Sequence, residues 1–166
     1  MRVAILTLSD SGYAGTREDL SGPLIAHMVE QEGHQVVYTQ LLPDGIELLY
    51  TTLCQLCDEN RADLILTTGG TGFSPRDLTP EATAQAIQRP APGIAEGMRY
   101  HSLQITPKAM LSRATAGIRA QTLIVNLPGS PKAVGECLEY ILPPLAHGLE
   151  ILTGQSGNCA RTEERT

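Results

Sequence analysis

Residues 67–83 read TTGGTGFSPRDLTPEAT and join a short apolar run to a helical pattern. Three glycines lie within four positions, so the backbone can leave N–H groups uncovered and close to an anionic oxygen. A cation and a carboxylate, Arg76 and Asp77, follow as an expected charge pair. We therefore predict a strand–loop–helix unit whose loop binds a phosphate. The alternative is an ordinary turn between a strand and a helix.

Four largely apolar segments predict strands, the first and last of them buried, and helical spacing separates them. The strands are expected at residues 2–8, 35–42, 64–68 and 122–127. Helices are expected at residues 21–32, after the turn at 43–45, at 94–103, at 107–111 and at 131–152. A further helix is expected to begin after Thr79, which would be its N-cap, with Pro80 at the first helical position. The last helix is expected to be interrupted or to restart at Pro143-Pro144. Residues 112–119 are expected to be irregular or a short hairpin. This alternation predicts a single α/β domain, residues 1–154, with a doubly wound, mostly parallel sheet and helices on both faces. Residues 155–166 are expected to form a polar, flexible tail.

Three aspartates, Asp10, Asp44 and Asp77, follow three different predicted strands. Ligands of such sheets bind beyond the carboxyl ends of the strands, where these loops and residues 128–130 would meet. Carboxylates beside a phosphate would repel it unless a cation lay between them, and Mg²⁺ binds one or two carboxylates together with phosphate oxygens. We therefore expect Mg²⁺-dependent phosphoryl or nucleotidyl transfer. The alternative for each aspartate is a turn, helix-start or capping role.

The composition narrows the class of partner. A net charge of −6 provides no broad basic surface for nucleic acid or for an anionic membrane. No apolar stretch approaches the ~18–20 residues of a membrane span. The first ten residues are typical of a strand rather than a signal peptide. We therefore expect a cytoplasmic protein.

Other chemical motifs are absent or weak. The C-x-x-C at Cys54 and Cys57 lies inside a helical pattern without a second ligand pair, which favours ordinary helical thiols over zinc or redox chemistry. The chain has neither G-x-G-x-x-G after its first strand nor the G-K-[ST] ending of a P-loop. Five cations near the predicted loops are either phosphate partners or solvated surface residues: Arg76, Lys108, Arg113, Arg119 and Lys132.

Five blocks in order resemble the MogA/MoaB family of molybdenum cofactor biosynthesis, which includes the amino-terminal domain of gephyrin: LSDSG…EDLSG, LLPDG, TTGGTGFSPRDLTPEAT, PKAMLSRATAGIR and LPGSPKAV. The resemblance spans roughly residues 3–152. It implies a homotrimeric molybdopterin adenylyltransferase, which transfers AMP from Mg·ATP to the terminal phosphate of molybdopterin and releases pyrophosphate. A separate molybdate-inserting protein is implied downstream.

The resemblance also implies roles for individual residues. Asp77 and Asp44 match the critical carboxylates of the family and are the expected catalytic residues and Mg²⁺ ligands. Gly45 departs from the family, in which an acidic or polar residue is common at that position. The expected substrate contacts are Ser9, Asp10, Ser11, Thr68, Gly69, Gly70, Thr71, Gly72, Arg76, Ser112, Pro128, Gly129 and Ser130. The alternatives are a catalytically silent molybdopterin carrier or scaffold of the MoaB type, and a general nucleotide-binding α/β domain.

Overall fold

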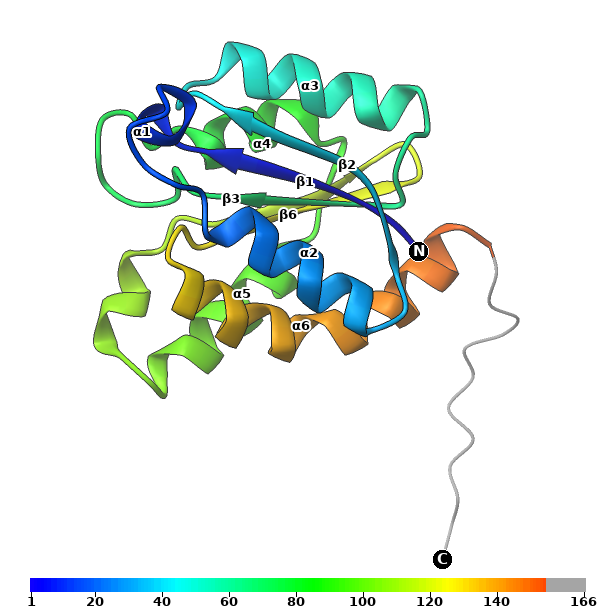
Figure 1. The fold of residues 1–166 in the computed structure, drawn as a ribbon. Coiled ribbons are helices and arrows are strands. Elements are labelled where there is room, and N and C mark those ends of the chain that lie inside the picture. Colours follow the sequence, from blue (N-terminus) through cyan, green and yellow to red (C-terminus); the bar gives the residue numbers. More distant parts are fainter. Residues whose placement is uncertain (155–166) are drawn as a thin grey trace, which may run out of the picture.

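A computed structural model describes residues 1–154 of the chain, and Figure 1 shows a sheet with helices on both faces. The strands are β1 (Arg2–Leu8), β2 (Gln35–Leu42), β3 (Leu64–Thr68), β4 (Arg89–Pro90), β5 (Ala116–Arg119) and β6 (Thr122–Leu127). The helices are α1 (Asp10–Tyr13), α2 (Ser21–Gln31), α3 (Glu47–Asp58), α4 (Thr79–Ala86), α5 (Pro92–Leu103), the 3₁₀ helix η1 (Pro107–Leu111) and α6 (Pro131–Leu152). The expected tail, residues 155–166, lies outside the described residues.

The sheet is mixed and mostly parallel, as predicted. Its strand order is β2-β1-β3-β6-β5-β4, in which β2, β1, β3 and β6 run parallel to their neighbours. β5 runs antiparallel to β6, and β4 runs antiparallel to β5. The four strands predicted from apolar runs have the predicted bounds. Because these four strands are parallel, the loops that follow them emerge at one edge of the sheet.

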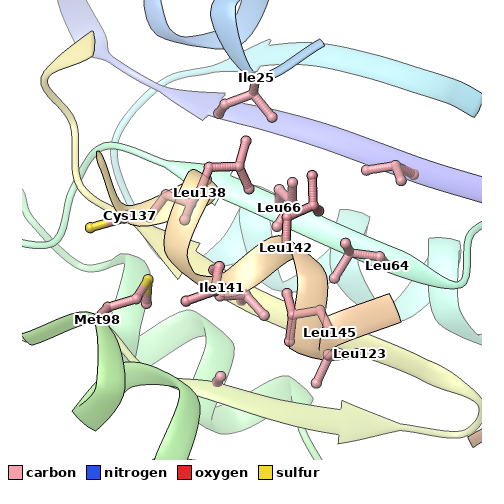
Figure 2. Packing of buried hydrophobic residues seen from close by; sticks show 14 of the residues in the cluster. Ile25, Leu64, Leu66, Met98, Leu123, Cys137, Leu138, Ile141, Leu142 and Leu145 are labelled. Carbon is pink, nitrogen blue, oxygen red and sulfur yellow. The ribbon is translucent and has the colours of Figure 1, made fainter. Parts of the chain in front are cut away.

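Two layers of helices cover the sheet and enclose two apolar cores (Figure 1). Helices α3 and α4 pack on one face, with Leu53 and Leu56 among their fully buried side chains. Helices α2, α5 and α6 pack on the other face. Figure 2 shows the apolar side of α6, including Leu138 and Leu142, turned toward Leu66 of β3. No helix among residues 1–154 is both long and apolar enough to cross a membrane.

Helix α6 continues through Pro143 and Pro144, so the predicted interruption is wrong. A proline inside a helix removes a hydrogen bond and costs about 3 kcal/mol or more. Both prolines lie on the exposed side of α6, as do Glu139 and Tyr140, whose carbonyls lose their helical partners. The opposite side buries Ile141 and Leu145, and each such side chain contributes about 1.5–3 kcal/mol. Burial of the apolar side therefore keeps the helix continuous.

The segment 112–119 is partly regular. Residues 116–119 form β5, which pairs with β6 as a hairpin, while residues 112–115 connect η1 to β5. The two-residue strand β4, which the sequence did not predict, pairs with β5 at Gly117 and Ile118. The hairpin alternative for this segment is thus confirmed, and the antiparallel edge of the sheet comes from it.

Candidate functional site

A cavity of about 590 Å³ opens where the carboxyl ends of the parallel strands meet. The residues following β1, β2, β3 and β6 all contribute to its wall, as the sequence predicted. Ten of the expected site residues line it: Ser9, Asp10, Ser11, Asp44, Thr68, Gly69, Gly70, Asp77, Gly129 and Ser130. The structure therefore brings together side chains and backbone from four separate loops.

Two glycines of the loop after β3 adopt backbone conformations that other residues rarely reach. Gly69 has φ 93° and Gly70 has φ 62°. A Cβ atom at Gly69 would lie 2.2 Å from the carbonyl oxygen of Leu8, and one at Gly70 would lie 2.4 Å from Oγ1 of Thr79. The loop thus runs against its neighbours so closely that only glycine fits, which leaves its backbone exposed toward the cavity.

Thr79 joins this loop to helix α4 and does not cap the helix as predicted. Its hydroxyl donates to the Gly69 carbonyl over 2.9 Å, and its amide donates to the Gly70 carbonyl over 3.1 Å. Leu78 occupies the capping position without a side-chain hydrogen bond. Helix α4 begins at Thr79 itself, so Thr79 occupies the first helical position and not the capping position, and its hydroxyl donates to the loop that holds the glycines.

Asp10, Asp44 and Arg76 join three loops. The Asp10 amide donates to Asp44 Oδ2 over 2.9 Å, and the Asp44 amide donates to Asp10 Oδ1 over 3.0 Å. Arg76 donates from Nε and Nη2 to the Asp10 carboxylate, each over 2.9 Å, and also donates to the Asp44 carbonyl. The predicted pair between Arg76 and Asp77 is therefore wrong, because the guanidinium reaches across to the loop after β1. Arg76 itself does not line the cavity.

The Asp77 carboxylate closes a tight turn within its own loop. Its Oδ2 accepts a hydrogen bond from the Ser74 amide over 2.9 Å, while the Asp77 amide donates to the Ser74 carbonyl over 2.9 Å. A Cβ at Gly72 would lie only 2.8 Å from the same Oδ2. The carboxylate is thus held beside the glycine loop and faces the cavity.

Electrostatic differences separate the aspartates. Arg76 lowers the pKa of Asp10 below its usual value, chiefly through the hydrogen bonds to its carboxylate. Burial raises the pKa of Asp44, and the negative charges of Asp10 and Asp77 raise it further. Asp10 is therefore balanced by a protein cation, whereas Asp44 lies in a position where an added cation would be stabilising.

Asp44 and Asp77 offer the hard oxygen atoms that Mg²⁺ binds. No group of three or more His, Cys, Asp and Glu among residues 1–154 is placed to hold a metal ion by itself. Mg²⁺ commonly binds one or two carboxylates and takes its other ligands from substrate phosphates and water. The two aspartates therefore fit a cation that arrives with a phosphorylated substrate.

Two helices begin at the cavity, and the N-terminus of α6 favours anions there, whereas that of α2 is already capped by a carboxylate. Ser130 caps α6, where its Oγ accepts a hydrogen bond from the Ala133 amide over 3.3 Å. At α2, Asp19 accepts hydrogen bonds from the Ser21 and Gly22 amides, both over 3.0 Å. Ser21 also donates to the Gly129 carbonyl over 2.9 Å. The sequence analysis missed Asp19 and Ser21 as cavity residues, although an aspartate just before a helix is a common capping pattern.

A second, more apolar cavity of about 300 Å³ lies on the other side of the glycine loop. Four expected site residues line this cavity and not the first: Thr71, Gly72, Ser112 and Pro128. Met98, Arg99 and Lys108 also contribute to its wall. The loop from Gly69 to Gly72 therefore separates two cavities and contributes residues to both.

The sequence analysis also missed the interactions of Arg113. Its Nε donates to the Gly72 carbonyl over 2.7 Å, and its guanidinium also binds Glu81 and the Asp77 carbonyl. Arg119 pairs with Asp58 over 2.8 Å and lines neither cavity. These two arginines are thus engaged by the protein, so the solvated-surface interpretation is wrong for them, and a contact with phosphate stays a prediction.

The cysteine motif lies in α3, as expected. Cys57 is buried, and burial raises the pKa of its thiol to about 12. A thiol with so high a pKa stays protonated at neutral pH, which disfavours both metal binding and redox chemistry. The interpretation as an ordinary helical thiol therefore agrees with the structure.

Sequence and structure comparisons match the chain to one family. The profile of the family described as "Probable molybdopterin binding domain" matches residues 4–147. The molybdopterin adenylyltransferase of Helicobacter pylori (strain ATCC 700392 / 26695) is 40% identical over 156 residues, which cover 93% of this chain and 89% of that protein. Gephyrin of Dictyostelium discoideum is 41% identical over 163 residues, covering 92% of this chain and 23% of that longer protein.

A solved structure has the same fold. The molybdopterin biosynthesis enzyme MoaB from Thermus thermophilus superposes with a TM-score of 0.87 at 47% identity, over 92% of this chain and 96% of that one. The family model and the relatives each cover most of the chain, and the observed sheet and loops agree with the resemblance found in the sequence. The chain therefore belongs to the molybdopterin-binding family that includes the MogA and MoaB proteins.

Proposed function

We propose that this protein is a molybdopterin adenylyltransferase, which transfers AMP from ATP to the terminal phosphate of molybdopterin. The relative from Helicobacter pylori bears that name at 40% identity over nearly the whole chain. The observation that carries the proposal is the meeting of Asp44 and Asp77 with a glycine loop at one cavity. The second cavity behind the same loop suits a reaction in which two substrates meet there.

The reaction is an in-line displacement at the α-phosphorus of ATP. An oxygen of the molybdopterin phosphate forms a new bond to this phosphorus. The bond between the α-phosphorus and the oxygen that bridges to the β-phosphate breaks, and pyrophosphate leaves with its electron pair. The attacking phosphate is already anionic, so the protein need not provide a nucleophile. Catalysis then depends on positioning and on electrostatic stabilisation.

Asp44 and Asp77 are the residues that would hold Mg²⁺. When bound there, Mg²⁺ supplies positive charge that neutralises the phosphate oxygens. Asp10 has a different part, because Arg76 already balances its carboxylate. Asp10 instead orients Asp44 through the hydrogen bonds between their amides and carboxylates.

The glycine loop and the N-terminus of α6 bind the phosphates in this proposal. Gly69 and Gly70 line the cavity and contribute only backbone to its wall. The N-terminus of α6 at Ser130 adds a positive dipole beside the glycine loop, since Gly129 lies against Gly69. These groups hold the reacting phosphates in place before any charge moves.

One assay tests the proposal against its two alternatives. The protein is incubated with Mg·ATP and molybdopterin, and pyrophosphate and adenylylated pterin are measured together. An adenylyltransferase forms both products, and neither forms when molybdopterin is omitted. A silent carrier binds molybdopterin without forming pyrophosphate, and a general nucleotide-binding domain binds ATP but not the pterin. Either of the last two results would contradict the proposal.

The assembly and location expected from the resemblance belong to the same proposal. We propose a homotrimer in the cytoplasm that passes its product to a separate molybdate-inserting protein. Light scattering on the purified chain tests the trimer, since the mass of one chain is 17.8 kDa. A monomeric mass would contradict this part of the proposal alone.

A further inference from the structure

We propose that Arg113 is a positioning residue, which holds the segment 71–77 and thereby sets the Asp77 carboxylate. The expected effect on the rate rests on the proposed function, whereas the expected effect on the order of segment 71–77 rests on the geometry alone. Arg113 comes from the connection between η1 and β5, far from Asp77 in the sequence. It touches neither cavity, so its effect must pass through the residues it binds.

Arg113 binds both ends of the loop that carries Asp77. Its backbone amide donates to the Thr71 carbonyl over 3.0 Å, and its Nε donates to the Gly72 carbonyl over 2.7 Å. Its Nη2 donates to the Asp77 carbonyl at the other end. Within the loop itself, hydrogen bonds between Ser74 and Asp77 form one turn. One guanidinium therefore fixes the distance between the two ends of the loop.

Glu81 holds the guanidinium in that orientation. Nη1 of Arg113 donates to Glu81 Oε1, and Glu81 lies in the first turn of α4, directly after the loop. Helix α4 is itself joined to the glycine loop by Thr79. The loop, the helix and Arg113 thus form one hydrogen-bonded unit around Asp77.

Lysine cannot reproduce this arrangement. Three different nitrogen atoms of the planar guanidinium bind three acceptors that lie on different sides of it. An ammonium group at the end of a flexible stem is a single point of charge and lacks this fixed fork. Arg113→Lys keeps the charge and most of the side-chain length but removes the planar fork of donors, which makes it the variant of choice.

Arg119 provides a matched control. It also binds a helical carboxylate through two nitrogens, at Asp58, and donates to a backbone carbonyl, at Ala86 over 3.0 Å. It lies at the end of the sheet away from the two cavities, where β5 pairs with the first residue of β6, and it lines neither cavity. Arg119→Lys therefore removes a similar set of interactions without touching the loop of Asp77.

The first measurement is amide hydrogen exchange of residues 72–78 in the folded variants. Arg113→Lys is expected to speed exchange in this segment, and Arg119→Lys is expected to leave it unchanged. Circular dichroism and thermal melting establish that both variants are folded. Unchanged exchange in Arg113→Lys would overturn the proposal. The hydrogen-exchange measurement tests the positioning role even if the wild-type protein is inactive. Inactivity of the wild type would contradict only the proposed function.

The second measurement is the kcat and KM of adenylyl transfer. Arg113→Lys is expected to lower kcat by about 10²-fold, the scale of a ~1 Å misplacement, with KM close to wild type. Arg119→Lys is expected to keep the wild-type kcat. Guanidinium chloride should partly restore Arg113→Ala, and methylammonium chloride should not. An active wild type with equal kcat in Arg113→Lys, or equal losses in the two lysine variants, would overturn the proposal.

Discussion

Asp10 and Asp44 hold each other through reciprocal hydrogen bonds, in which each backbone amide donates to the other residue's carboxylate over 2.9 and 3.0 Å. The two residues follow β1 and β2, which are neighbours in the sheet. Arg76 donates two hydrogen bonds to the Asp10 carboxylate. No cation among residues 1–154 binds the Asp44 carboxylate in this way, and partial burial raises the pKa of Asp44. One aspartate is thus a structural partner, and the other is the better candidate for a cation ligand.

Asp44→Asn should lower the rate of adenylyl transfer by at least ~10²-fold, the scale of losing one electrostatic contact to the transition state. The amide oxygen of asparagine can still accept from the Asp10 amide, so the fold should be retained. Molybdopterin binding should stay close to that of the wild type. Steady-state kinetics and a binding titration check both parts, and a wild-type rate in Asp44→Asn would exclude its catalytic role.

Arg76→Ala should affect activity more than stability. The Arg76–Asp10 pair is exposed, at 57% and 46% of the two side chains, and such pairs contribute about 0–1 kcal/mol. The free energy of unfolding should therefore fall by no more than ~1 kcal/mol. Loss of the link between the loops should lower the rate by about 10- to 100-fold. Chemical denaturation and kinetics measure the two effects, and a large loss of stability with an unchanged rate would contradict this account.

Gly69→Ala should destabilise the fold. A non-glycine residue at φ 93° costs about 1–3 kcal/mol, and its Cβ would collide with the Leu8 carbonyl at 2.2 Å. Gly135→Ala in helix α6 is the control, because a Cβ there meets nothing within 4 Å. It should stabilise the protein by up to ~1 kcal/mol. Equal unfolding free energies for the two variants would contradict the strained geometry of the loop.

The ion pair between Glu81 and Arg113 should give a pH-dependent contribution to stability. Arg113 lowers the pKa of Glu81 below its ordinary value of 4.5 through its hydrogen bond. A carboxylate with a lowered pKa stabilises the folded state above the unfolded pKa and loses this effect as the pH falls through the folded pKa. The Tm of the wild type should therefore exceed that of Glu81→Gln at neutral pH. The difference should shrink as the pH falls below 4.5, and a difference that grows toward acid would contradict the assignment.

Local patterns predicted most of the fold. The four predicted strands have the bounds of β1, β2, β3 and β6. β1, β3 and β6 are buried along nearly their whole length, and such a strand is apolar at most positions, whereas β2 lies at the edge of the sheet and is only partly buried. The loops after these four strands are rich in Gly, Ser, Pro and Asp, and this composition predicted a site at the carboxyl ends of the strands. The predicted interruption of the last helix at Pro143 was wrong, because packing of the buried side of α6 outweighs the effect of the helix-breaking residue.

The interactions of the site were less predictable, because their partners are distant in the sequence. Arg76 was expected to pair with its neighbour Asp77 but binds Asp10 instead. Thr79 was expected to cap α4 but donates to Gly69. Arg113 lies in the PKAMLSRATAGIR block, but nothing in that block indicates that its side chain binds the Asp77 carbonyl. Sequence patterns therefore predicted which loops meet, whereas hydrogen-bond geometry was needed to assign roles within them.

The most direct test of the central claim is the formation of pyrophosphate and adenylylated pterin from Mg·ATP and molybdopterin by the wild type and by Asp77→Ala. The account predicts that the wild type forms the two products in equal amounts and that Asp77→Ala, although folded, loses this activity. An active Asp77→Ala variant, or a wild type that binds molybdopterin and never releases pyrophosphate, would contradict it.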